Sequence, residues 1–257
     1  MGWKGVAIGG YVGSLFGGPL GAILGAVLGH KVENTVFGQK RRVGYAEMPS
    51  GNRSMVFCAS AAAMLAKMAK ADGRISQSEI MRVESAFRRL GFSPQVREYA
   101  VSVFRKAKDD SHSIYDYARE FAQAVESIEV RELLYELLWE VAVADGVIGA
   151  PELQVLQHLP RCLGIRSEWY GYFRSRFVAS APAEPARDPL ADAYAMLGAS
   201  AKDDAETLKR KYRELAKRNH PDALRAQGLP EEMVGKATER MSRINEAWAK
   251  VKEARGL

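Results

Sequence analysis

The residues with the clearest chemical potential are His220, Pro221 and Asp222, which follow one another after a run of basic residues. An imidazole titrates near neutral pH and binds metals, so His220 invites an acid–base or metal-binding interpretation. No second histidine and no cysteine lies near it in the sequence. We therefore do not expect His220 to catalyse a reaction, and we expect no cofactor.

The segment before the triplet, residues 203–219, has the periodicity of an amphipathic helix. The apolar residues recur at three- and four-residue spacing and should share one buried face: Leu208, Tyr212, Leu215 and Ala216. The opposite face carries cations that we call the basic stripe: Lys209, Arg210, Arg213 and Lys217. Asp203 with Glu206 has capping-box form and predicts the start of the helix. Pro221 predicts its end, because proline disfavours the α conformation in the preceding residue.

Two further motifs flank this helix. The order along the chain is Ala193 to Gly198, then Tyr212-x-x-Leu215-Ala216 with the triplet, then Arg243 to Trp248. In these motifs and their order the chain resembles a J-domain, the module with which DnaJ-type co-chaperones activate DnaK-type ATPases. The resemblance implies that the triplet and the basic stripe bind a DnaK-type chaperone. The periodicity further predicts the core of an antiparallel helix pair: Leu208, Tyr212, Leu215, Ile244, Ala247, Trp248 and Val251.

This region also departs from the usual J-domain pattern. Ala223 stands where many J-domains carry a basic residue, and Asn219 where an aromatic residue is common. Residues 224–234 form a longer connection than a minimal loop. That connection resembles the one in membrane-anchored DjlA-type proteins.

The N-terminal region contains an uncharged stretch, residues 5–29, without Asp, Glu, Lys or Arg. As a helix it would be about 37 Å long, which is enough for a hydrocarbon core of roughly 30 Å. Glycine recurs at every fourth position, and such spacing lets a second helix approach closely in a membrane. The sequence therefore predicts a transmembrane helix in the lipid bilayer, with a ridge that could support a homodimer: Gly9, Gly13, Gly17, Gly21, Gly25 and Gly29.

Three alternatives remain for this stretch: a cleaved signal peptide, a flexible glycine-rich tail, and a monomeric anchor whose glycines have no specific role. Only Lys4 precedes the stretch, whereas several cations follow it: Lys31, Lys40, Arg41 and Arg42. The positive-inside rule then places the rest of the chain in the cytoplasm. The DjlA-type resemblance implies the same single-pass topology in the bacterial inner membrane, with a short N-terminus in the periplasm.

Residues 53–178 have helical periodicity throughout and contain an internal repeat. The segment that begins at Ala71-Asp72-Gly73 returns at Ala144-Asp145-Gly146. The repeat matches the second half of an EF-hand loop, which makes four carboxylates candidate metal ligands: Asp72, Glu79, Asp145 and Glu152. The first half of such a loop is missing, so we favour helix ends and caps over metal binding. The duplicated motif resembles the TerB-like helical domain.

Composition fits this organisation. The chain has 257 residues, of which 47% are hydrophobic and 26% charged, with a formal charge of +6. It can therefore bury a sizeable core, and it is not a disordered protein. Cys58 and Cys162 lie far apart in apolar contexts and should be buried, reduced thiols.

The predicted fold is all-α, with a transmembrane helix, a TerB-like domain and a J-domain helical hairpin. The expected ranges are an anchor over 1–30, a connector over 31–52, the TerB-like domain over 53–178, a proline-containing linker over 179–189 and the J-domain over 190–257. We expect a membrane-anchored co-chaperone that is not itself an enzyme. The alternatives are a stress-signalling scaffold centred on the TerB-like domain and a divalent-cation sensor. Nucleic-acid binding is disfavoured because the basic stripe lacks interleaved exposed aromatic residues.

Overall fold

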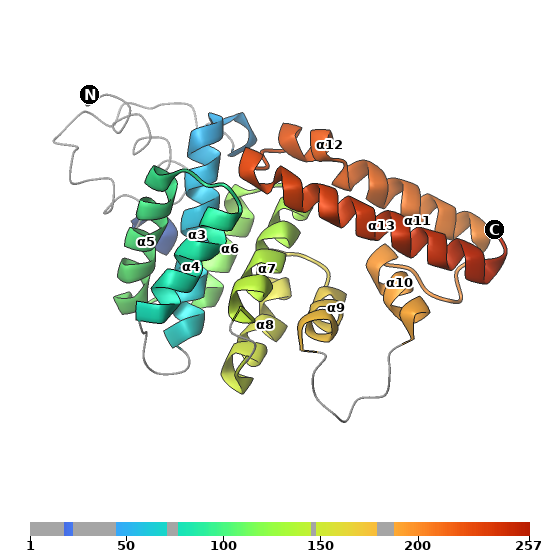
Figure 1. Ribbon diagram of the computed structural model, residues 1–257, viewed down its shortest axis with the longest axis horizontal. Helices are drawn as coiled ribbons and strands as arrows, with labels where there is room; N and C mark the ends of the chain where they lie inside the picture. The colour runs from blue at the N-terminus through green and yellow to red at the C-terminus, as the bar shows by residue number, and fades with distance from the viewer. Residues whose placement is uncertain (1–17, 23–44, 71–76, 145–147, 179–187) are drawn as a thin grey trace.

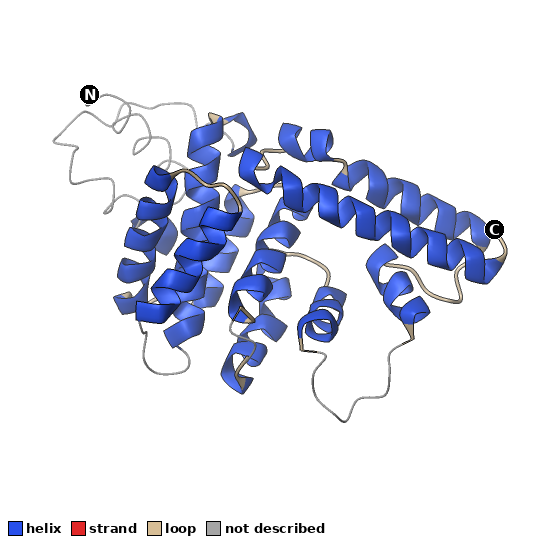
Figure 2. Ribbon diagram, in the orientation of Figure 1, coloured by secondary structure: helices blue, strands red, loops and turns tan. Residues whose placement is uncertain are grey.

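The computed structural model describes residues 18–22, 45–70, 77–144, 148–178 and 188–257 (Figure 1). Within these ranges every regular element is a helix, and Figure 2 shows blue helices joined by tan loops with no red strand. The predicted all-α class is therefore confirmed. None of the helices in the described ranges is long and apolar enough to span a membrane.

The first group of helices follows the short 3₁₀ turn η2 (Tyr45–Glu47). Its members are α3 (Ser50–Lys70), α4 (Gln77–Arg89), α5 (Pro94–Asp109), α6 (Ile114–Ala124), α7 (Ile128–Ala142), α8 (Ala150–Leu163) and α9 (Glu168–Phe177). Helix α3 lies at the centre and packs against α5, α6 and α7. Residues 56–66 of α3 are all buried, because alanine and other small residues let neighbouring helices approach from several sides.

Side-chain caps fix where several of these helices begin. Ser113 and Asp116 form a reciprocal capping box at the start of α6, and Ser127 caps α7. In the second copy of the repeat, Pro151 stands in the first turn of α8 and Glu152 accepts a hydrogen bond from the amide of Gly149 at 2.9 Å. This arrangement agrees with the capping interpretation of the repeat.

The second group of helices begins at α10 (Pro189–Leu197). It continues with α11 (Ala205–Asn219), the short α12 (Pro221–Ala226), the 3₁₀ turn η3 (Glu231–Met233) and α13 (Val234–Arg255). Helices α11 and α13 lie side by side (Figure 1). They are antiparallel, because Arg255 at the end of α13 donates to the carbonyl oxygens of Ala201 and Asp203 just before α11, at 2.8 and 3.1 Å.

The predicted core of this pair is confirmed at its centre, whereas Leu215 and Ala216 of the predicted buried face are only half-buried. Leu208, Ile244 and Val251 are fully buried. The Tyr212 and Trp248 rings, which are partly buried, stack with their centroids 4.9 Å apart and their planes 7° from parallel. Apolar spacing at three and four residues was enough to identify this face, because both helices bury a single stripe.

One local prediction about α11 needs correction. Its N-cap is Asp204, whose carboxylate accepts from the amide of Thr207 at 2.6 Å. Asp203 lies one residue earlier and binds the ammonium of Lys211 at 2.6 Å instead, which lowers the pKa of Asp203. The predicted end of α11 is confirmed at Asn219, and the chain after it forms α12, which the sequence did not predict. Proline is favoured in the first helical turn, so the residue that ends α11 also begins α12.

Of the uncharged stretch 5–29, the structure describes only residues 18–22. They lie against α6, where the carboxylate of Glu120 accepts hydrogen bonds from the amides of Gly18, Leu20 and Gly21 at 2.8, 2.6 and 3.2 Å. Leu20 is fully buried. This position and a position in the lipid bilayer are alternatives for the same five residues.

The cysteine prediction is confirmed for one residue and wrong in part for the other. Both thiols are free. Cys58 is buried in α3, and burial raises the pKa of its thiol. Cys162, near the end of α8, is only partly buried, and the Arg119 guanidinium lies 3.9 Å from its sulfur.

Candidate functional site

The triplet lies at the junction of α11 and α12. His220 has φ −62° and ψ 131°, which is extended backbone, so it separates the two helices and serves as the N-cap of α12. Its Nδ1 accepts a hydrogen bond from the amide of Asp222 at 3.3 Å. A neutral imidazole that accepts at Nδ1 carries its proton on Nε2, which leaves a donor for a partner. The His220 side chain is 57% exposed.

Asp222 is the most exposed member of the triplet, yet its carboxylate is held by Arg225. The Asp222 Oδ1 atom lies 2.9 Å from the Arg225 guanidinium. The same guanidinium forms a fork with Glu231, with distances of 3.1 and 3.3 Å. Hydrogen bonding to Glu231 is the main reason why the pKa of Arg225 is raised. Arg225 therefore links the triplet to the residues before α13.

Arg225 was missed in the sequence, where residues 224–234 were treated as a connection. Its spacing of three residues from Asp222 is typical of an ion pair on a helix. The three-residue spacing indicates an ion pair only if a helix follows Pro221. Pro221 was interpreted solely as the end of α11.

The four residues of the basic stripe are all exposed on α11. Arg210 forms an ion pair with Glu214 at 3.3 Å. Among the described residues, Lys209, Arg213 and Lys217 form no ion pair, so their charges are available to an approaching anionic surface. A hollow of about 420 Å³ lies on this part of α11, lined by stripe residues and the first turn of the helix.

The structure brings the stripe and the triplet onto one continuous surface. Arg213, Lys217 and His220 follow one another at spacings of four and three residues, which is the repeat of a helix face. An α-helix is a rigid support, so the distance between these cations and the triplet is fixed by α11 itself. Chemically, the surface can attract a negatively charged partner and then bind it through a hydrogen-bond donor, a proline ring and a carboxylate.

The other predicted site residues lie elsewhere. Asp72 and Asp145, the side chain of Glu79, and all ridge glycines except Gly21 lie outside the described residues. Glu152 caps α8, as described above. Within the described ranges, no group of three or more histidine, cysteine or acidic side chains is placed to hold a metal ion.

Comparisons with known proteins match three family models to separate parts of the chain. Residues 1–42 match the co-chaperone DjlA transmembrane domain, residues 59–173 match the tellurite resistance protein TerB, and residues 192–255 match the DnaJ domain. The co-chaperone protein DjlA of Coxiella burnetii is 31% identical over the full length of both chains. That of Vibrio parahaemolyticus is 29% identical over 83% of this chain and 84% of its own. No solved structure gives a significant match.

Proposed function

This chain belongs to the DjlA family of J-domain co-chaperones, and on that premise we propose that it recruits a DnaK-type chaperone and stimulates its ATP hydrolysis. The observation that carries the proposal is the continuous exposed surface formed by the basic stripe and the triplet. In this proposal the protein is a regulator of a partner's ATPase and does not itself catalyse a reaction.

Binding begins with electrostatic attraction. Lys209, Arg213 and Lys217 are exposed and lack ion pairs within the described chain, so their field reaches an acidic surface on the chaperone and raises the association rate. Exposed charges are screened over about 8–10 Å at physiological salt. Recruitment should therefore weaken as the ionic strength rises.

Stimulation requires more than recruitment. A ligand shifts a conformational equilibrium only if it binds one state more tightly than the other. We assign this discrimination to His220, Pro221 and Asp222, which would contact the hydrolysing state of the ATPase more closely than its resting state. The Asp222–Arg225–Glu231 contacts support the proposal, because they hold the exposed carboxylate in one position before the partner arrives.

The membrane segment adds localisation. The match of residues 1–42 to the DjlA transmembrane domain supports an anchor, and the cations after residue 29 support a topology with the helical domains in the cytoplasm. In the bacterial inner membrane, such an anchor would raise the concentration of active chaperone near membrane-associated clients.

The test is single-turnover ATP hydrolysis by a DnaK-type chaperone, measured with the full chain in detergent. Wild-type protein should accelerate hydrolysis, and His220→Gln should abolish the acceleration. His158→Gln is a matched control, because His158 is an exposed histidine on α8, away from the triplet. Acceleration that survives in His220→Gln, or its absence in the wild type, would refute the proposal and favour the scaffold interpretation.

A further inference from the structure

Helix α7 carries three carboxylates along one face, Glu132, Glu136 and Glu140, spaced four residues apart. We call them the acidic face. The side chains of Glu132 and Glu136 are only 5% and 3% exposed, and that of Glu140 is 26% exposed. Carboxylates are seldom buried without partners, because losing their hydration is costly. The partners of the acidic face are therefore informative about what covers it.

Each of the three carboxylates has a cationic partner on α13, in the J-domain, and Glu132 also lies 3.8 Å from Arg166, just before α9. Arg240 pairs with Glu132, Arg243 with Glu136 at 2.5 Å, and Lys236 with Glu140 at 2.7 Å. These three cations are the polar part of what we call the docking face. Burial raises the pKa of Glu140, and the Lys236 ammonium opposes that rise.

Arg240 is the most deeply enclosed of these cations, at 1% exposure. Its guanidinium lies 4.5 Å from the ring centroid of Trp169 in α9. The Trp169 Nε1 in turn donates to the same Glu132 carboxylate at 2.6 Å. Arginine is suited to this position, because its planar group can pair with a carboxylate and stack on an aromatic ring at once.

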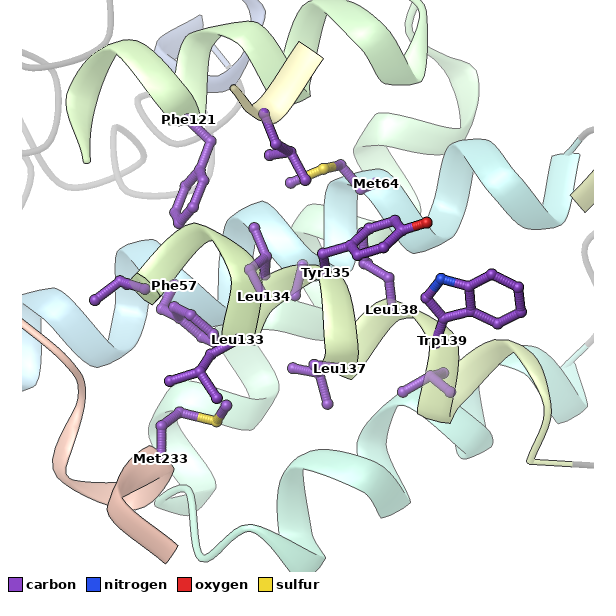
Figure 3. Packing of buried hydrophobic residues seen from close by; sticks show 14 of the residues in the cluster. Phe57, Met64, Phe121, Leu133, Leu134, Tyr135, Leu137, Leu138, Trp139 and Met233 are labelled. Atoms are coloured by element: carbon purple, nitrogen blue, oxygen red, sulfur yellow. The ribbon is translucent and has the colours of Figure 1, made fainter. Parts of the chain in front are cut away.

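An apolar contact lies beside the ion pairs. Residues 228–233, between α12 and α13, complete the docking face. Leu229 and Met233 are each 1% exposed, and Figure 3 draws Met233 in one cluster of buried side chains with Phe57 of α3 and Leu133 of α7. Gly228 has φ 96°, and a Cβ atom there would lie 3.0 Å from the Tyr45 ring. Residues 228–233, part of the predicted long connection, thus insert into the core of the first helical group.

A third contact joins α9 to α10. The Arg166 guanidinium lies 4.5 Å from the Trp169 ring centroid and donates to the carbonyl oxygen of Met196 at 3.4 Å. Gly198 caps α10 with φ 60°, and a Cβ atom at this position would collide with Arg166. The backbone of the J-domain therefore approaches this arginine closely.

We propose that the J-domain is docked on the TerB-like domain through the docking face, so that the two form one cooperative unit. Buried ion pairs, an inserted apolar segment and a close backbone approach all lie at this contact, and all four basic-stripe residues and His220 remain exposed on the other side of the hairpin. The docking does not depend on the proposed function. The functional consequence of docking does rest on the proposed function. The chaperone would meet a triplet held in one orientation and would not contact Lys236, Arg240 or Arg243.

Scanning calorimetry of the full chain in detergent tests this proposal. The wild type should unfold in one transition that includes both domains. Arg243→Glu should lower the J-domain transition by roughly 6–20 °C and separate it, because breaking a buried pair leaves an unpaired charge. Adding Glu136→Arg to Arg243→Glu should restore much of the loss, since the swapped charges can pair again. This recovery distinguishes lost docking from general misfolding.

The matched control is Arg213→Glu, which reverses an exposed charge on α11. It should leave the unfolding transition unchanged while it reduces ATPase stimulation. His220→Gln should likewise abolish stimulation without shifting the transition, so the two proposals fail separately. Separate transitions in the wild type, or an Arg243→Glu variant that melts like the control, would overturn the docking.

Discussion

At the scale of residues, Arg225 is the group that couples the triplet to the rest of the J-domain. It contacts Asp222 on one side and Glu231 on the other, and all three side chains are exposed. Such exposed pairs contribute little to folding stability. Their effect should therefore appear in the partner interaction, where a carboxylate held in place loses less conformational entropy on binding.

We predict that Arg225→Gln weakens chaperone stimulation without abolishing it. The Asp222 carboxylate would lose its restraint, so the co-chaperone concentration for half-maximal stimulation should rise about two- to five-fold. Titrations of single-turnover ATP hydrolysis measure this. Arg225→Lys should have a smaller effect, because it keeps the charge but loses the fork. Arg161→Gln, an exposed arginine on α8, is the control, and an equal effect of both glutamine variants would contradict the prediction.

At the scale of elements, the helix starts show what local sequence can decide. Periodicity over 203–219 predicted α11 and its buried face, because the apolar stripe needs only the 3.6-residue repeat. It did not separate Asp203 from Asp204 as the cap, because both are acidic and adjacent. The choice depends on Lys211 and the amide of Ser200, which hold Asp203 outside the helix. Helix α12 was missed for a related reason, since one proline both ends and begins a helix.

The capping box of α6 yields a prediction on pH dependence. Hydrogen bonds from the hydroxyl and amide of Ser113 lower the pKa of Asp116. Because the folded-state pKa lies below the unfolded value of about 3.9, this stabilisation is present above that pH and is lost as the pH falls through the folded-state pKa.

We therefore expect Asp116→Asn to lower the free energy of unfolding by about 1 kcal/mol at pH 7, the usual contribution of such a cap. The difference from wild type should shrink steadily as the pH falls below about 4. Denaturant titrations at pH 7 and pH 3 measure it. Asp109→Asn, at the exposed end of α5, should change little at either pH. A difference that stays constant with pH would show that the carboxylate charge is not responsible.

At the scale of the whole molecule, the arrangement of the two helical groups could not be predicted from sequence. Glu132, Glu136 and Glu140 lie on a helix with many apolar residues, and Arg240 and Arg243 lie just before and at the start of the motif Arg243 to Trp248. Each set alone suggests a solvated face. Only the tertiary structure shows that they are buried against each other. The proline-containing stretch predicted as a linker gave no sign of this contact.

The N-terminal residues 18–22 contact Glu120, although they belong to a region that matches a transmembrane domain. They can therefore lie either on Glu120 or in the bilayer. In the chain extracted into detergent, we expect hydrogen exchange at residues 18–22 to be slow and to accelerate at least about ten-fold in Glu120→Ala, since three amides lose a charged acceptor. In lipid vesicles, where the bilayer can hold the same segment, exchange and membrane retention should be equal in both proteins.

The control for this experiment is Glu120→Gln, whose side-chain oxygen can still accept hydrogen bonds, so its exchange should lie between the other two. Exchange in detergent that is equally fast in wild type and Glu120→Ala would show that the contact does not persist. A smaller fraction of Glu120→Ala than of wild type retained on the vesicles would show that Glu120 contributes to anchoring.

The docking of α13 also sets a condition on exchanging modules between co-chaperones. A foreign J-domain grafted after residue 189 would bring its own triplet, but it would fit this recipient only if it also carried cations that match Glu132 and Glu136. Without them, the buried Glu136 would lose its counter-ion, and Glu132 would keep only the Arg166 side chain 3.8 Å away. The docking face of the transplanted J-domain thus decides whether such a chimaera assembles. A J-domain that keeps every chaperone-binding residue can still fail to dock on this TerB-like domain.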